Sequence, residues 1–244
     1  INSKINWRGS SDTETLLEAI EFWGIEETLQ KIKGMFAFGI WDKKKHILTL
    51  ARDRMGEKPL YFGWQGKGDN KVFLFGSELK ALKVHPEFNG KINHDAIALQ
   101  LRHNCIPDPY SIYENIYKLL PGHYLLLQEN NLKEGLLPVP KVYWSLTESA
   151  IYGNSNQLTL NKNNIQNDLE KRLQSSVKKQ MISDAPLGAF LSGGIDSSTV
   201  VAMMQSQSNH PIKTFTIGFS EDDYNEAQDA KKIAKHLGTD HTEL

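Results

Sequence analysis

A glycine-rich segment near the C-terminal end of the chain has the residue types of a phosphate-binding loop. Residues 192–198 read Ser-Gly-Gly-Ile-Asp-Ser-Ser, between an apolar run and an expected helix. Adjacent glycines allow a tight turn whose bare N–H groups can approach an anion. The following helix directs its positive N-terminus to the same place. Asp196 opposes an anion unless a divalent cation bridges the two, so the segment predicts a site for ATP with Mg²⁺.

This loop is not a Walker A motif, because no Gly-Lys-Ser/Thr follows the glycines. It resembles the pyrophosphate loop of ATP pyrophosphatases, with the pattern S-G-G-x-D-S. Those enzymes split ATP between the α and β phosphates and transfer AMP to a substrate. The resemblance implies ATP and Mg²⁺ as cofactors, with Asp196 as a metal ligand. The implied ATP-binding residues of the loop are Ser192, Gly193, Gly194, Asp196 and Ser197. The alternative interpretation is a glycine-rich turn capped by Asp and Ser side chains.

The elements around the loop alternate as a parallel sheet requires. The apolar pattern predicts a helix over 165–181, a strand over 187–191, a helix to about 204, a strand over 214–219 and a helix over 227–237. Gly238 then stands in the position that ends a helix. This order predicts a parallel sheet of the doubly wound type. Sheets of this type bind ligands at the carboxyl ends of their strands.

The N-terminal part of the sequence predicts a layered α+β domain. A helix over 12–30 is expected to begin with a capping box made by Ser11 and Glu14. Ser77 and Asn93 are expected to cap two shorter helices. The first strand is apolar throughout, as in a strand buried on both faces. The expected strands form a β-meander, typical of an antiparallel sheet, over 35–41, 47–51, 60–64 and 72–75, with one more over 122–127.

Five segments of this part resemble the class II glutamine amidotransferase domain, a branch of the N-terminal-nucleophile hydrolases. In chain order they are Ser-Asp-Thr-Glu at 11–14, Gly-Met-Phe-Ala-Phe at 34–38, the residues Arg-Asp and Gly-Glu-Lys-Pro-Leu-Tyr within 52–61, Ser-Glu-Leu-Lys-Ala-Leu at 77–82 and Leu-Pro-Gly-His at 120–123. In that order ahead of S-G-G-x-D-S, they resemble asparagine synthetases of the B type, which hydrolyse glutamine. The resemblance covers essentially the whole chain.

The resemblance implies two partial domains. Residues 1–135 would be the rear of a glutaminase domain with an N-terminal-nucleophile-hydrolase-like layered sandwich. Residues 136–164, rich in Asn and with two prolines, would connect it to the next domain. Residues 165–244 would be the front of an ATP-binding synthetase domain with an α/β parallel sheet like that of adenine-nucleotide alpha-hydrolases. The implied reaction makes asparagine from aspartate, ATP and glutamine, through a β-aspartyl-adenylate and internally transferred ammonia.

Three further positions take their roles from the resemblance. Asp12 is implied to bind the α-amino group of glutamine, as a carboxylate can. Asp12 could equally serve the helix dipole alone, and the two roles are compatible. Leu191 and Ile217 match positions whose main chain contacts the nucleotide. The alternative for both is ordinary strand core, which we expect for their side chains.

The nucleophile of the family is an N-terminal cysteine, whereas residue 1 here is Ile. We therefore expect the catalytic Cys to lie upstream, in a longer protein, and the fragment alone to be inactive. Cys105 is no substitute, because it lies mid-chain and has no terminal amine. A cysteine at such a position is more often a small packed hydrophobe than a nucleophile.

Composition limits the other classes of function. The net charge of −1, from 28 basic and 29 acidic residues, gives no sign of nucleic acid or a membrane as partner. A single cysteine excludes an internal disulfide and favours the cytoplasm. A homodimer stays open. Two alternatives also stay open: an amidotransferase or lactam-forming synthetase acting on another carboxylate, and a nucleotide-binding module without glutaminase activity.

Overall fold

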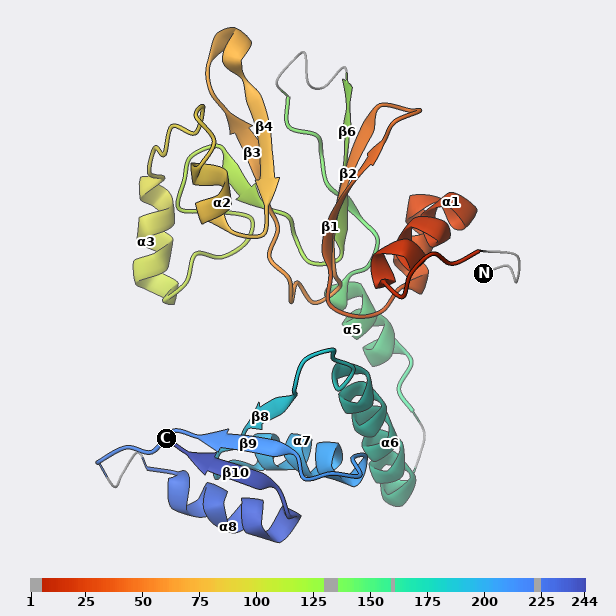
Figure 1. Cartoon of the computed structure of the whole chain (residues 1–244), viewed down its shortest axis with the longest axis vertical. Coiled ribbons are helices and arrows are strands. Elements are labelled where there is room, and N and C mark those ends of the chain that lie inside the picture. The colour runs from red at the N-terminus through yellow and green to blue at the C-terminus, as the bar shows by residue number, and fades with distance from the viewer. Residues whose placement is uncertain (1–5, 130–135, 159–160, 222–224) are drawn as a thin grey trace. The chain divides into compact units, whose positions relative to one another are not determined.

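Two units divide the chain between Gln157 and Leu158, and each is described by itself. The computed structural model describes residues 6–129, 136–158, 161–221 and 225–244 (Figure 1). The expected domain boundary at residue 135 and part of the expected connection, at 159–160, lie outside the described residues. None of the described helices combines the length and the apolar character needed to cross a membrane.

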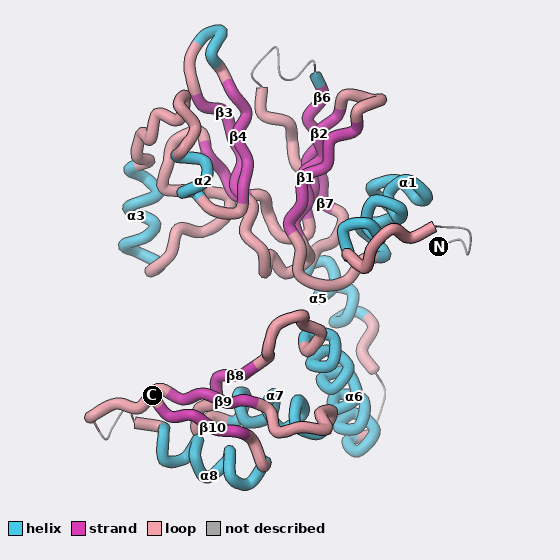
Figure 2. The backbone as a smooth tube through the Cα atoms, viewed as in Figure 1, coloured by secondary structure: helices cyan, strands magenta, loops and turns pink. Residues whose placement is uncertain are grey.

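The N-terminal unit contains two antiparallel sheets. The first has the order β1-β2-β6-β7 and the second the order β4-β3-β5. The antiparallel pairing is confirmed, but the expected single meander is wrong. The β1–β2 hairpin and the β3–β4 hairpin belong to different sheets, and later strands complete each sheet (Figure 2). The strands are β1 (Ala37–Asp42), β2 (Ile47–Arg52), β3 (Tyr61–Gln65), β4 (Val72–Gly76), β5 (Ile116–Lys118), β6 (His123–Gln128) and β7 (Lys141–Val142).

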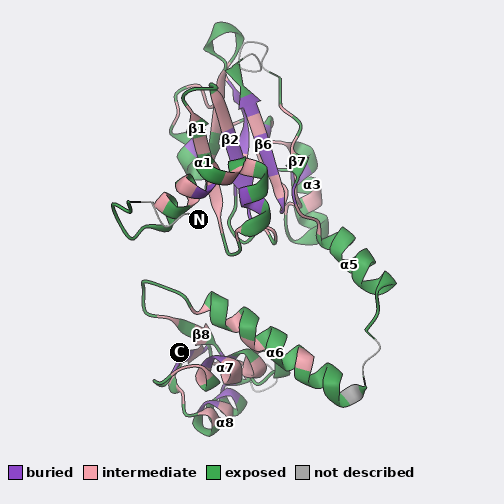
Figure 3. Ribbon diagram, turned by 90° about the vertical axis from the view of Figure 1, so that its right-hand side faces the viewer, coloured by how far each residue is buried: buried purple, intermediate pink, exposed green. Residues whose placement is uncertain are grey.

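Alternation along β2 and β6 builds a core on each face of the first sheet. Leu50 and Leu125 pack with Phe62 of the second sheet. Their neighbours Ala51 and Tyr124 pack on the opposite face with residues of the helix α1 (Asp12–Lys31). Successive side chains of a strand point to opposite faces, which explains the two cores. Figure 3 shows the buried residues concentrated on β2 and β6.

The resulting order of layers is helix, sheet, sheet, helix. In Figure 1, α2 and α3 lie on the side of the second sheet that faces away from β1 and β2. The bounds of these helices are Leu79–Lys83 for α2 and His94–His103 for α3. Asn93 caps α3 as expected, accepting the N–H groups of Asp95 and Ala96. Ser77 does not cap α2, because Glu78 holds the cap position and makes no side-chain cap bond there.

The start of α1 differs from a capping box. Ser11 Oγ accepts the Thr13 N–H at 3.2 Å, so the cap itself is present. Glu14 does not reach back to Ser11; its carboxylate accepts the N–H groups of Arg8 and Gly9 at 2.8 and 2.9 Å. The backbone just before the helix therefore binds the Glu14 carboxylate, which is not available to cap Ser11.

The strand β1 is not buried on both faces. It lies at the end of its sheet, and its exposure alternates along its length. Trp41 is 47% exposed and Met35, just before the strand, 46%. The apolar composition of β1 predicted that both faces would be buried, but the described elements cover only part of this edge strand.

Residues 136–157 are part of the N-terminal unit. The strand β7 pairs with β6, and the helix α5 (Leu146–Ser155) follows. Tyr143 lies between them and is buried. Burial raises the pKa of its hydroxyl, which stays protonated and donates to the Arg52 carbonyl at 2.9 Å. Most of the segment expected as a connection, residues 136–157, therefore belongs to the N-terminal unit.

The C-terminal unit has the predicted parallel sheet, in the order β10-β9-β8. Neighbouring strands in this sheet are also consecutive in the chain. The change of direction in strand order that defines a doubly wound sheet is not present among the described strands. Leu191, Val201, Ala230 and Ala234 form the core between the sheet and its helices. The elements are α6 (Lys162–Gln180), β8 (Gly188–Phe190), α7 (Ile195–Ser206), β9 (Lys213–Thr216), α8 (Ala227–Leu237) and β10 (Asp240–Glu243). Gly238 ends α8 with φ 72°, as expected.

Candidate functional site

The glycine-rich loop lies at the carboxyl edge of the parallel sheet, between β8 and α7. Leu191 joins it to the strand, and both of its main-chain groups are engaged. Its N–H donates to the Phe215 carbonyl at 2.9 Å, and its carbonyl accepts the Thr216 hydroxyl. The loop therefore leaves the sheet from a fixed point.

Serine hydroxyls give the loop its shape. Ser197 Oγ accepts the Ser192 N–H at 3.1 Å, and the two hydroxyls lie 2.7 Å apart. Ser192 Oγ also accepts the Gly194 N–H at 3.2 Å. A Cβ on Gly193 would lie 3.1 Å from the Cβ of Asp229, so a larger residue there would push against α8. The loop and the start of α7 thus form one compact turn with little room for side chains.

A cavity of about 400 Å³, here called the loop cavity, opens beside this turn. Its polar part is Ser192, Ser197 and Thr216. Glu226 is the one charged side chain among the described residues that line it. An apolar wall with a polar end is the usual character of a small-ligand site. The apolar lining residues are Phe190, Leu191, Phe215, Ile217 and Phe219.

Leu191 and Ile217 differ in how they meet this cavity. The Leu191 side chain is 2% exposed and packs in the core, as expected. Ile217 is 55% exposed and follows β9, so the expectation of strand core for its side chain is wrong. The strand was expected to continue to residue 219 but ends at Thr216, which leaves Ile217 on the cavity wall.

Glu226 was not found by sequence reasoning. It directly precedes α8, and its Oε2 accepts the Gly193 N–H at 3.2 Å. The two residues are 33 positions apart, so no local pattern links them. The only sequence signal is an acidic residue at the start of a helix, which the helix dipole alone explains.

The residues of the loop fit a Mg²⁺ ion that arrives with phosphates. Asp196 is exposed in the first turn of α7 and makes no hydrogen bond or ion pair with the described residues. Within those residues no group of three His, Cys, Asp or Glu side chains could hold a metal by itself. Mg²⁺ commonly uses one or two carboxylates and takes its other ligands from phosphates and water. The donor set therefore suits a metal–nucleotide complex better than a permanent metal site.

The N-terminal unit has a second cavity, of about 730 Å³, here called the α1 cavity. Asp12 lines it from the first residue of α1, and its side chain is exposed. Lys58 and Ser77 line it from other elements. With residues 34–38, which also line it, the cavity thus brings together residues from four of the segments that resemble glutamine amidotransferases. Cys105 is exposed and is not among the lining residues.

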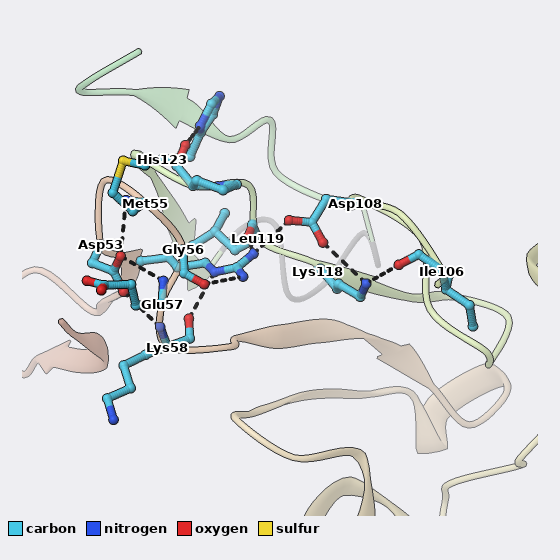
Figure 4. Close-up of polar contacts among 12 residues, drawn as sticks. Asp53, Met55, Gly56, Glu57, Lys58, Ile106, Asp108, Lys118, Leu119 and His123 are labelled. Carbon is cyan, nitrogen blue, oxygen red and sulfur yellow. Dashed lines mark hydrogen bonds and ion pairs between the residues drawn. The ribbon is translucent and has the colours of Figure 1, made fainter. Parts of the chain in front are cut away.

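A fully buried carboxylate shapes one wall of the α1 cavity. Asp53 accepts the N–H groups of Met55, Glu57 and Lys58 at 3.1, 2.9 and 2.9 Å (Figure 4). It also accepts the Phe36 N–H at 3.3 Å. Phe36 and Lys58 both line the cavity, so Asp53 fixes two parts of its wall.

Arg52 holds the same turn from the other side. Its guanidinium donates to the carbonyls of Lys58 and Gly56 at 2.9 and 2.8 Å, and to Asp108 at 2.9 Å. Asp108 also pairs with Lys118 at 3.3 Å. Gly56 has φ 68°, a conformation that other residues rarely adopt. The motif of residues 52–61 is therefore a scaffold that positions the Lys58 backbone.

Comparison with known families accounts for both units. The family model for the glutamine amidotransferase domain matches residues 1–181, and the one for asparagine synthase matches residues 168–244. The first match covers most of the chain, and the chain belongs to the glutamine amidotransferase domain family.

Several relatives match along nearly the whole chain. The putative asparagine synthetase [glutamine-hydrolyzing] 2 of Methanocaldococcus jannaschii is 37% identical over 95% of this chain. Asparagine synthetase [glutamine-hydrolyzing] 1 of Bacillus subtilis is 33% identical over 93%, and amidase chyE of Penicillium rubens 29% identical over 98%. The chain spans 42%, 33% and 35% of the lengths of these three relatives.

Proposed function

We propose that this chain is part of a glutamine-dependent asparagine synthetase that uses ATP and Mg²⁺. The observation that carries the proposal is the glycine-rich loop at the carboxyl edge of a parallel sheet, beside a cavity. The family match and the two asparagine synthetases among the relatives support it. The order of layers in the N-terminal unit supports an N-terminal-nucleophile-hydrolase-like sandwich. The parallel sheet supports an adenine-nucleotide alpha-hydrolase-like domain in the C-terminal unit.

In this proposal the loop cavity binds ATP. The N-terminus of α7 would face the phosphates, and Ser192 and Ser197 offer hydroxyls. The N–H groups of Gly193 and Gly194 would reach the phosphates on leaving their present acceptors, Glu226 and Ser192. The main chain around Leu191 and the wall at Ile217 would contact the nucleoside. Because the Leu191 N–H is taken by Phe215, only its carbonyl oxygen retains hydrogen-bonding capacity. Mg²⁺, when bound through Asp196, would neutralise phosphate charge and favour loss of pyrophosphate.

The proposed synthesis has two chemical steps. A β-carboxylate oxygen of aspartate attacks the α-phosphorus of ATP, and the bond to the β-phosphate oxygen breaks, releasing pyrophosphate. Ammonia then attacks the acyl carbon of the β-aspartyl-adenylate, and AMP leaves. A free carboxylate is a poor electrophile, so conversion into a mixed anhydride with a good leaving group makes amide formation feasible.

The α1 cavity would bind the glutamine that supplies the ammonia. Asp12 can accept a charge-assisted hydrogen bond from the α-ammonium group. The nucleophile implied by the resemblance, an N-terminal cysteine, stays a prediction. The domain boundaries after residues 135 and 164, the homodimer and the cytoplasmic location stay predictions as well.

The full-length protein tests this function directly. Incubated with ATP, Mg²⁺, aspartate and ammonium, it should form equal amounts of AMP, pyrophosphate and asparagine. Omission of aspartate should abolish the formation of AMP. Release of ADP and phosphate in place of AMP and pyrophosphate would contradict the assignment of the loop.

A second candidate keeps the chemistry and changes the acceptor. The similarity to amidase chyE shows that a relative outside the asparagine synthetases matches over 98% of this chain. An amidotransferase acting on another carboxylate would form AMP only when that acid replaces aspartate. A panel of carboxylic acids, compared by pyrophosphate release, separates the two candidates.

A further inference from the structure

The Glu226 side chain contacts the glycine-rich loop from a separate element. Its Oε2 accepts the Gly193 N–H at 3.2 Å, and its side chain lines the loop cavity. N–H groups of such loops are the donors that bind phosphate oxygens. A carboxylate of the protein therefore occupies a donor that an anionic ligand would use.

Two anions cannot share this donor without a counter-charge. A phosphate oxygen that approaches Gly193 meets a carboxylate of the same charge, and a partly enclosed cavity screens the repulsion less than bulk water does. Because Glu226 is exposed, its side chain is free to leave the N–H. A divalent cation relieves the repulsion by lying between the two kinds of oxygen.

A second carboxylate at the loop is available for such a cation. Asp196 makes no hydrogen bond or ion pair with the described residues, unlike Asp229 nearby, which pairs with Lys232 at 2.9 Å. Two carboxylates therefore lie at the loop. Glu226 occupies the Gly193 N–H, which a phosphate could use, and Asp196 has no partner among the described residues. Phosphate alone is disfavoured by this arrangement, and phosphate with Mg²⁺ is not.

We propose that Glu226 is a specificity-determining residue of the proposed nucleotide site: it opposes metal-free phosphate groups at the loop and so makes pyrophosphate and ATP binding depend on Mg²⁺. The inference rests on the proposed function, since it assumes that the loop binds these ligands. The new element is that Glu226, a residue outside the loop motif, excludes metal-free ligands.

Binding of pyrophosphate and of ATP to the full-length protein tests the inference without turnover. Isothermal titration calorimetry would be run in excess Mg²⁺ and again in EDTA. Glu226→Gln should strengthen metal-free binding by roughly tenfold, the change that removing about 1.4 kcal/mol of repulsion gives. Binding in excess Mg²⁺ should stay the same or weaken. The ratio of the two affinities therefore falls in the variant.

Glu221→Gln is the matched control. Glu221 is exposed, precedes the same helix and accepts a hydrogen bond from Ser220, and it does not line the loop cavity. The control removes the same charge and should leave the ratio unchanged. Glu226→Ala, which cannot bond to Gly193, should shift the ratio in the same direction as Glu226→Gln.

The outcomes separate the inference from the proposed function. If wild type and Glu226→Gln bind pyrophosphate with the same dependence on Mg²⁺, the inference is wrong and the nucleotide site stands. Weaker metal-free binding in both Glu226 variants would also overturn it, because the carboxylate would then assist the ligand. If wild type binds neither ligand in either condition, the nucleotide site and the inference both fall.

Discussion

Oδ2 of Asp53 accepts the backbone N–H of Lys58 at 2.9 Å, so a fully buried carboxylate fixes a residue that lines the α1 cavity. The same carboxyl group accepts three further N–H groups. Hydrogen bonds to a charged acceptor contribute more than those between neutral groups. This cluster therefore stabilises the N-terminal unit and shapes its cavity.

Asp53→Asn should destabilise the N-terminal unit by about 3 kcal/mol, because the amide nitrogen would face N–H donors that it cannot accept. Urea unfolding followed by tryptophan fluorescence reports on this unit, since all five tryptophans lie in it. Asp69→Asn is the control: Asp69 is exposed, and we expect its effect to stay within about 0.5 kcal/mol. Equal stability of the two variants would show that the Asp53 bonds contribute little.

Asp12→Asn in the full-length protein should impair synthesis driven by glutamine and spare synthesis driven by ammonia. Only glutamine carries the α-ammonium group that this carboxylate is proposed to hold. Losing one charge-assisted hydrogen bond implies roughly a tenfold to hundredfold weaker use of glutamine. The Ser11 cap does not involve Asp12, so α1 should stay folded.

The comparison for Asp12 needs both nitrogen sources and a second variant. Glu21→Gln removes a charge from an exposed position of the same helix that does not line the cavity. It should leave the rates with glutamine and with ammonia unchanged. Equal loss with both sources in Asp12→Asn would mean that the residue serves folding, and the role in binding glutamine would be wrong.

Asp196→Asn should weaken the part of ATP binding that depends on Mg²⁺, because an amide ligand carries no charge. The measurement is aspartate-dependent ATP–pyrophosphate exchange across a range of Mg²⁺ concentrations. The variant should need several-fold more Mg²⁺ for half-maximal exchange, because the uncharged amide binds the ion more weakly. Asp184→Asn, at an exposed position outside the loop, is the control. Wild-type exchange by Asp196→Asn at every Mg²⁺ concentration would exclude the metal role.

Local patterns in the sequence predicted part of the local structure. The carboxyl edge of the parallel sheet, the Asn93 cap and the Gly238 helix end follow from spacing and residue type, and the structure has all three. The separation of the two hairpins into different sheets could not be predicted, because it depends on pairing of β2 with β6 far along the chain. Each hairpin alone is equally consistent with a meander.

The same limit applies to the candidate sites. The loop motif predicted a nucleotide site at the edge of the sheet, and the structure has a cavity beside the loop, but nucleotide binding stays a prediction. The exposed Ile217 was misjudged because β9 ends at Thr216, three residues before the end of the expected strand. Glu226 meets Gly193 through tertiary packing alone. Lys58 and Asp12 line one cavity although they lie on separate elements, and only the folded unit brings them together.

The central claim, transfer of ammonia from glutamine to an activated carboxylate, is tested most directly with labelled glutamine. The full-length protein would be given glutamine labelled with ¹⁵N at its amide, together with ATP, Mg²⁺, aspartate and an excess of unlabelled ammonium. The account predicts that, while glutamine is being hydrolysed, the side-chain amide of the asparagine formed carries more ¹⁵N than the free ammonium pool. Asparagine with the isotope content of the free pool, or no asparagine at all, would contradict it.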